Sequence, residues 1–254
     1  MTRSVLLTRL LGLAALGVTA AAVVQGLVIQ GPTVEQHEYS RLLVVHPPLA
    51  TVTFVAFGVT ALASLLYLIP ATRRWSWDEL AGASAEVGVV LCALTLATGA
   101  IWGKPTWGVW WTWDARITSE ALLLALYLGY LALRRIPADR HVRAKRSAVA
   151  ALVAAVDIPI VHYATSWWQT LHQPNFRLLQ ADKQLDTPQL VGMLLGFAAI
   201  SLIYAWLLIH RYHVEQLEAR LEDDGLTLAL EQRRAEGVGA ASAAAAQAAT
   251  GASV

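Results

Sequence analysis

Six long runs of apolar residues constrain this 254-residue chain more than any other feature of its sequence. The hydrocarbon core of a lipid bilayer is about 30 Å thick, so a helix that crosses it needs roughly 20 consecutive apolar residues. We therefore predict an all-α integral membrane protein with six transmembrane helices. The predicted spans are residues 10–29, 49–69, 80–101, 117–133, 148–163 and 190–209.

The basic residues between these runs predict how the chain is oriented. Lys and Arg are retained on the cytoplasmic side of a membrane. Fourteen of them fall on one side of a six-span arrangement and five on the other. We therefore predict cytoplasmic termini and three outer loops at residues 30–48, 102–116 and 164–189. The five outer residues are Arg41, Lys104, Arg116, Arg177 and Lys183.

The two ends of the chain raise separate questions. The first apolar run follows Arg3 and Arg9, as in a cleaved signal peptide, but it is longer than the usual signal core of about 7 to 15 residues. We interpret it as a retained anchor.

Residues 1–212 form the predicted membrane domain, and residues 213–254 form a predicted cytoplasmic tail. Residues 214–234 of this tail are predicted to be helical, and the Ala-, Gly- and Ser-rich residues 235–254 disordered.

Composition excludes several classes of function. Cys92 is the only cysteine, so the chain has no disulfide framework, no Cys-x-x-Cys redox pair and no Cys-x-x-Cys-His site for covalent haem. The net charge of +1 is too balanced for a nucleic-acid partner held by phosphate contacts.

Tryptophans are concentrated in the second outer loop, where residues 102–116 hold five of the ten in the chain. Trp107, Trp110 and Trp111 would share one face of a helical segment and form a flat aromatic platform. Such a platform suits a steroid, a quinone, a lipid or a porphyrin. The alternative is an ordinary aromatic belt at the membrane surface.

Two histidines are predicted to lie on the same side of the membrane as this loop. His46 is at the outer start of the second span, and His172 is in the third outer loop after Trp167 and Trp168. Two imidazoles from separate elements are what six-coordinate haem iron requires. His162, at the outer end of the fifth span, competes for either role. A hydrogen-bonded structural histidine is the alternative for each.

Haem propionates need matching positive charge at an apolar interface. Arg41 lies five residues before His46, and Arg116 closes the tryptophan-rich segment, so both are candidates. The alternative for each is an interfacial arginine whose head group reaches water. Glu120, one helical turn beyond Arg116, would pair with it and set its direction.

Three segments together resemble one known family. Residues 102–116, WGKPTWGVWWTWDAR, resemble the WWD signature of haem-handling proteins of cytochrome c maturation. Residues 41–47, RLLVVHP, and residues 162–173, HYATSWWQTLHQ, are similar to its haem exporter protein C (CcmC) type. The resemblance covers about residues 1–212.

This resemblance implies a non-enzymatic protein that binds haem b without covalent attachment, through His46 and His172. It also implies transfer of haem to a CcmE-type haem chaperone, and partnership with ABC transporter subunits of CcmA and CcmB type and a small CcmD-type subunit. We expect a platform beside the ring formed by Trp107, Trp110, Trp111 and Trp113. We expect Trp102 and Asp114 to contact the partner.

Three other functions would use similar residues. A membrane b-type cytochrome in electron transfer also has two histidine ligands, usually buried in facing spans. A haem permease subunit needs a polar path, and Glu86 and Asp157 mark such a path only poorly inside the spans. An assembly subunit would use the tryptophan loop as a docking surface for another protein.

Overall fold

The computed structural model describes residues 3–34, 36–172 and 185–251, and all its named elements are helices. Its contacts divide the chain into two units, Met1–Tyr212 and His213–Val254. Helix α7 begins in the first unit and ends in the second. In chain order the elements are α1 (Arg3–Val24), η1 (Gln25–Ile29), η2 (Glu38–Val44), α2 (His46–Leu68), α3 (Trp75–Trp107), α4 (Ala115–Arg135), α5 (Arg140–Ala155), α6 (Asp157–Trp167) and α7 (Thr187–Gly251).

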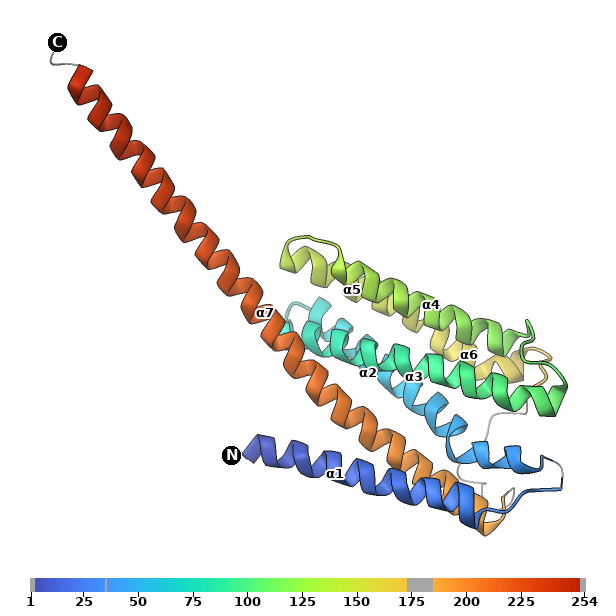
Figure 1. The fold of residues 1–254 in the computed structure, drawn as a ribbon. Coiled ribbons are helices and arrows are strands. Elements are labelled where there is room, and N and C mark those ends of the chain that lie inside the picture. Colours follow the sequence, from blue (N-terminus) through green and yellow to red (C-terminus); the bar gives the residue numbers. More distant parts are fainter. Residues whose placement is uncertain (1–2, 35, 173–184, 252–254) are drawn as a thin grey trace. The chain divides into compact units, whose positions relative to one another are not determined.

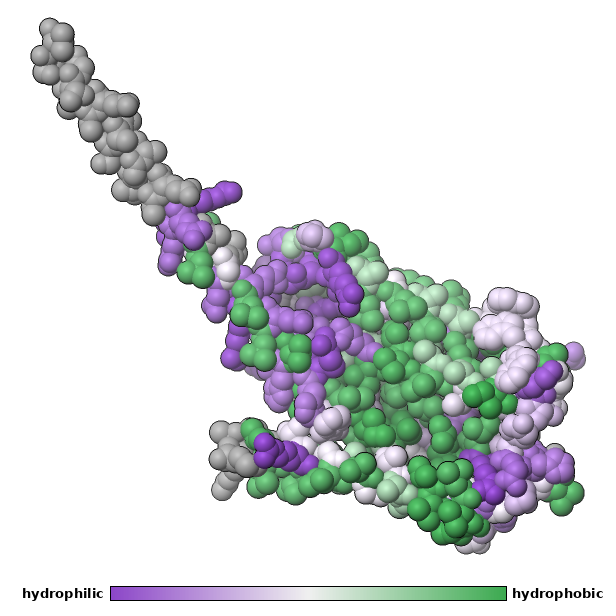
Figure 2. All heavy atoms as spheres, viewed as in Figure 1, coloured by the Kyte–Doolittle hydropathy of each residue, from purple (hydrophilic) through white to green (hydrophobic). Residues whose placement is uncertain are grey.

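Six helical segments among the described residues are long and apolar enough to cross a membrane, which confirms the predicted six-span, all-helical fold. In the first unit, η1 and the ends of α3 and α6 lie at one end (Figure 1). Figure 2 shows apolar side chains along the middle of this unit and polar side chains toward its ends. The segments are Val5–Ile29, Glu38–Leu68, Trp75–Trp107, Ala115–Arg135, Arg140–Trp167 and Thr187–Arg234.

The fifth span is built from two helices, α5 and α6, which meet at Val156. Pro159 lies in the first turn of α6. A proline lacks a backbone N–H, and its ring clashes with the carbonyl four residues earlier, so α5 cannot continue through this position. The proline that interrupts the apolar run in the sequence therefore marks a helix junction within one span.

Close packing of α2, α3 and α4 forms the main core of the first unit. The rings of Phe57 and Tyr127 stack with centroids 3.7 Å apart. A Cβ atom at Gly88 would lie 2.7 Å from Cε1 of Phe57, so glycine allows α2 to approach α3 at this point. Ser84 on α3 donates a 2.7 Å hydrogen bond to the Ala56 carbonyl on α2. These contacts hold the two helices that form one wall of the site.

The second unit contains the part of α7 beyond Tyr212. It is helical over residues 214–234, as the sequence predicts, but α7 continues to Gly251, where the sequence predicts disorder. Alanine has the highest helix propensity of the amino acids, which favours a helix in this alanine-rich segment. Residues 252–254 of the predicted disordered segment lie outside the described residues.

Replacing Gly196 with Ala should destabilise the first unit. A Cβ atom at this position of α7 would overlap the carbonyl oxygen of Val44, just before α2, and backbone atoms yield less easily than side chains. We expect a cost of about 1–3 kcal/mol, the usual range for overpacking. Thermal unfolding in detergent, followed by circular dichroism, measures the effect.

Gly58→Ala on α2 is the matched control, since no described atom lies within 4 Å of the Cβ it would add. This variant should melt at or slightly above the wild-type temperature, because alanine favours the helix. Equal melting temperatures for the two variants would contradict the proposed overlap.

Candidate functional site

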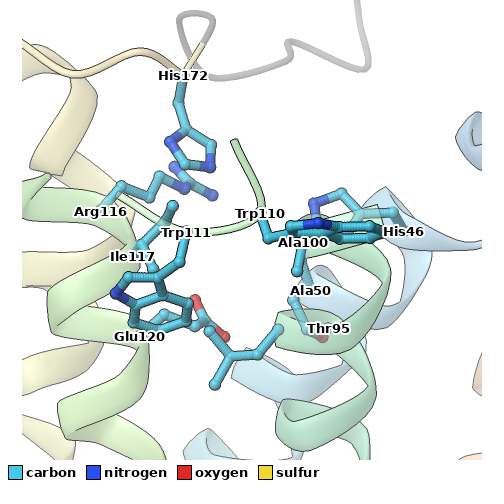
Figure 3. A pocket seen from close by; sticks show the side chains of 12 residues that line it. His46, Ala50, Thr95, Ala100, Trp110, Trp111, Arg116, Ile117, Glu120 and His172 are labelled. Atoms are coloured by element: carbon cyan, nitrogen blue, oxygen red, sulfur yellow. The ribbon is translucent and has the colours of Figure 1, made fainter. Parts of the chain in front are cut away.

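A pocket lies at the end of the first unit where α2 begins, α3 ends and α4 begins (Figure 3). The space between its side chains, open solvent included, is about 440 Å³. Figure 3 shows side chains from these helices and from two connections pointing into the pocket. The lining residues are His46, Ala50, Thr95, Leu96, Gly99, Ala100, Trp110, Trp111, Arg116, Ile117, Glu120 and His172.

His46 is held against helix α3. It is the first residue of α2, and the two prolines that follow it suit the start of a helix, where a backbone N–H is not needed. Nδ1 of its ring lies 3.0 Å from Oγ1 of Thr98. A Cβ atom at Gly99 would lie 3.0 Å from Cε1 of the ring, and Trp102 meets the ring edge-on at 5.7 Å. The side of α3 that faces α2 therefore sets the orientation of this imidazole.

The hydrogen bonds of Thr98 determine which nitrogen of His46 carries the proton. The Thr98 hydroxyl donates to the Leu94 carbonyl at 2.8 Å, so its oxygen accepts from His46. A neutral imidazole has one donor and one acceptor nitrogen. We therefore assign the proton of His46 to Nδ1, which leaves the lone pair on Nε2.

His172 is held by Asp114. Nδ1 of the ring lies 3.2 Å from Oδ2 of Asp114, and the same oxygen accepts from the Leu171 N–H at 3.4 Å. Trp107 contacts the ring with centroids 4.6 Å apart. A carboxylate only accepts hydrogen bonds, so Nδ1 of His172 is a donor and Nε2 again keeps the lone pair.

Asp114 also starts helix α4, because its Oδ1 accepts a 2.9 Å hydrogen bond from the N–H of Ile117. Burial alone would raise the pKa of Asp114, but this N–H and the His172 ring hold the pKa below its ordinary value. Burial lowers the pKa of His172, and the charge of Arg116 lowers it further, while Asp114 opposes both. At neutral pH the site therefore contains an ionised Asp114 and a neutral His172.

The tryptophans do not form the predicted helical platform. Helix α3 continues to Trp107 and stops at Gly108, whose φ of 80° is in the left-handed region that favours glycine. Only residues 108–114 of the predicted loop 102–116 are non-helical. The prediction that Trp107, Trp110 and Trp111 share a helical face is therefore wrong, because the chain turns at Gly108.

The structure nevertheless brings several of these tryptophans to the pocket. Trp110 and Trp111 line it directly. Trp113 meets Trp111 edge-on at 5.4 Å and is 80% exposed. Trp102 and Trp107 contact the two histidines from the last turns of α3. The indoles thus lie around the pocket from both sides of the Gly108 turn.

The two candidate arginines lie in different places. Arg116 lines the pocket. Arg41 forms a 2.6 Å ion pair with Glu38 and donates to the carbonyl oxygens of Gly26, at 3.2 Å, and of Leu27. Arg41 does not belong to the pocket lining. The guanidinium of Arg41 is instead bound by partners in η1 and η2. The short distance between Arg41 and His46 in the sequence does not reveal these partners.

Glu120 is buried and lines the pocket. Its place in the sequence had indicated only a pairing with Arg116. The Cys92 thiol lies 3.5 Å from Oε1 of Glu120 as a donor. His162 is not part of the pocket lining, and its ring faces Phe54 at 6.3 Å. Thr98 and Gly99 were missed by sequence reasoning, because nothing in one sequence shows which face of α3 meets α2.

Fold and site together define a multi-pass helical membrane protein whose pocket combines two neutral imidazoles, tryptophan rings and an arginine. The profile of the Heme exporter protein C (CcmC) family matches residues 1–226, and the chain belongs to this family. This confirms the resemblance noted from the sequence. Membership gives the chain a role in haem delivery for cytochrome c maturation, as a membrane component and not as an enzyme.

Individual relatives agree with this assignment. A Heme exporter protein C of Haemophilus influenzae is 36% identical over 184 residues, which cover 72% of this chain and 74% of the relative. A protein of the same name from Bradyrhizobium diazoefficiens is 35% identical over 181 residues, covering 71% and 68%. A putative cytochrome c biosynthesis ccmC-like mitochondrial protein of Arabidopsis thaliana is 32% identical over 164 residues, covering 65% and 60%.

The ligand-free protein should show a depressed pKa for His172, below the ordinary histidine value of about 6.5. The variant Asp114→Asn should lower the pKa further, because the negative charge that favours the imidazolium is removed. Titration of the histidine rings by NMR, with the signal assigned by His172→Gln, measures both values. A His172 that titrates above the ordinary value would contradict the burial of its ring.

Proposed function

We propose that this chain holds haem b without a covalent bond, between His46 and His172 at the periplasmic face of the inner membrane, and presents it to a CcmE-type haem chaperone. One observation carries the proposal. Two histidines from distant parts of the sequence line one pocket together with Trp110, Trp111 and Arg116.

The residues of the pocket fit a haem molecule as cargo. Iron is bound by the unprotonated nitrogen of a neutral imidazole. The hydrogen bonds of His46 and His172 both use Nδ1, so each ring keeps the lone pair of Nε2 for iron. When bound, haem supplies an iron atom that accepts one nitrogen from each ring. Cys92, the one cysteine of the chain, is not among the described residues that line the pocket.

The other lining residues have complementary tasks. Trp110 and Trp111 give the ring apolar contact, and Trp107 supports His172 from behind. Arg116 pairs with a propionate by charge-assisted hydrogen bonds. Arg116 lines the pocket and Arg41 does not, so we assign the propionate to Arg116.

The expected partner contacts change in the light of the structure. Trp102 and Asp114 contact His46 and His172, so we propose that both residues support the ligands and not the partner. Trp113, 80% exposed, and Trp110, 58% exposed, are the tryptophans that an incoming protein can reach. Exposed aromatic side chains are common anchors at protein interfaces. We propose that they contact the chaperone while haem is in the pocket.

The remaining partners belong to the same proposal. The family is part of the Ccm haem exporter system, which implies partners of the ABC class. We propose that these are CcmA-, CcmB- and CcmD-type subunits. Transfer is favoured over electron transport, because His46 starts a helix and His172 lies in a connection, both at one end of the bundle. A ligand held there is accessible to a second protein.

Substituting His46 or His172 with Ala should remove an iron ligand and lower haem affinity by about tenfold or more. His162→Ala and His210→Ala are the controls, since neither residue lines the pocket. Absorption spectra of the purified variants report low-spin haem, and acid acetone should extract the wild-type pigment. If His162→Ala loses low-spin haem and His172→Ala keeps it, the ligand assignment is wrong.

Replacing Trp107, Trp110, Trp111 and Trp113 together with Ala should abolish the haem-dependent complex with a CcmE-type chaperone. Single replacements should weaken haem retention only modestly, because one aromatic contact contributes about 0.5–1.5 kcal/mol beyond area burial. Co-purification of the chaperone at matched membrane expression measures the complex.

Replacing Trp167 and Trp168 together with Ala is the control, because it also removes indoles at the same end of the bundle. Both rings are exposed, and neither lines the pocket. The control should retain the chaperone. Full haem attachment to the chaperone in the fourfold variant would rule out the proposed tryptophan surface.

A further inference from the structure

The two histidines of the pocket are held by acceptors of different charge. His172 donates to the carboxylate of Asp114 at 3.2 Å, and His46 donates to the neutral hydroxyl of Thr98 at 3.0 Å. The Thr98 hydroxyl donates a hydrogen bond of its own to the Leu94 carbonyl and carries no charge. The two rings therefore have the same tautomer. They differ in their acceptors, because a carboxylate supplies more electron density to a ring than a neutral hydroxyl does.

We propose that Asp114 and Thr98 are positioning residues that make the two iron ligands unequal, and that Asp114 makes the site select ferric over ferrous haem. The inference rests on the proposed function, since it requires iron between the two rings. Asp114 draws the Nδ1 proton of His172 toward itself and gives the ring partial imidazolate character. Thr98 orients His46 but leaves it an ordinary neutral imidazole.

The physical basis is the effect of a carboxylate on a ligating imidazole. A carboxylate that accepts the second N–H of the ring raises the basicity of the ligand. A more basic ligand and a nearby negative charge both favour Fe(III), which carries one more positive charge than Fe(II). The Asp114 side chain is only 10% exposed, so water screens this charge weakly.

Arg116 is the charged group that opposes this effect. It lines the same pocket, and its positive charge offsets part of the field of Asp114. Asp114 accepts a hydrogen bond from the His172 ring, so its contribution is measured with Arg116 left in place.

The test is the reduction potential of haem in the purified full-length protein with Asp114→Asn. Asparagine is a good helix N-cap for α4 but has one acceptor oxygen in place of two, so the low-spin spectrum is recorded first to establish that His172 still ligates iron. The potential should shift in the positive direction, by about 59 mV for each tenfold loss of ferric preference in a one-electron couple. A spectroelectrochemical titration measures it.

Asp186→Asn is the matched control. Asp186 accepts a 2.8 Å hydrogen bond from the Gln189 N–H at the start of α7, so the same exchange of acid for amide occurs at a helix start outside the pocket lining. This control should keep the wild-type potential. Thr98→Val, which removes a neutral acceptor, should lower haem affinity and shift the potential much less than Asp114→Asn.

An unchanged potential in Asp114→Asn, or an equal shift in either control, would overturn the inference. If Asp114→Asn loses haem during purification, apo-protein is titrated with ferric and with ferrous haem. Ferric affinity should then fall more than ferrous affinity. Equal losses overturn the inference. Failure of the wild-type protein to bind haem overturns the proposed function instead.

Discussion

The carboxylate of Asp114 joins the fold of this protein to its site. One oxygen accepts the N–H of Ile117 and starts α4, and the other holds the ring of His172. The charge favours a helix N-terminus, where unpaired N–H groups and the helix dipole attract an anion. Because one side chain performs both tasks, the start of α4 and the direction of His172 are set together. The geometry of the pocket therefore depends on the residue that caps α4.

The other histidine depends on close contact between helices. His46 reaches its place because Gly99 leaves room beside its ring, and because Gly196 lets α7 approach the carbonyl of Val44 just before α2. Helices in a bilayer gain little from burying apolar surface, so association relies on close packing and hydrogen bonds. The hydrogen bond to Thr98 adds direction to this packing. The two ligands of the proposed haem are thus held by different means, His172 by a charged cap and His46 by a tight helix contact.

The candidate site could be assembled only in part from the sequence. His46, His172, Trp110, Trp111 and Arg116 share one pocket, as the common outer side of their segments suggested. Arg41 does not, because Glu38 and the carbonyls of η1 engage it first. Trp102 and Asp114, which we expected to contact the partner, lie against His46 and His172. Each difference arises from a local partner that sequence spacing does not show.

The sequence by itself determined the six-span helical fold and membership of the family. Span number follows from the length of apolar runs, and helix follows because a backbone in lipid must satisfy its own hydrogen bonds. The tertiary structure decided which side chains meet in the pocket. That depends on the turn at Gly108, the junction before Pro159 and the register between α2 and α3. These are matters of helix-to-helix contact, and residues far apart in the chain acquire a common environment only when the helices pack.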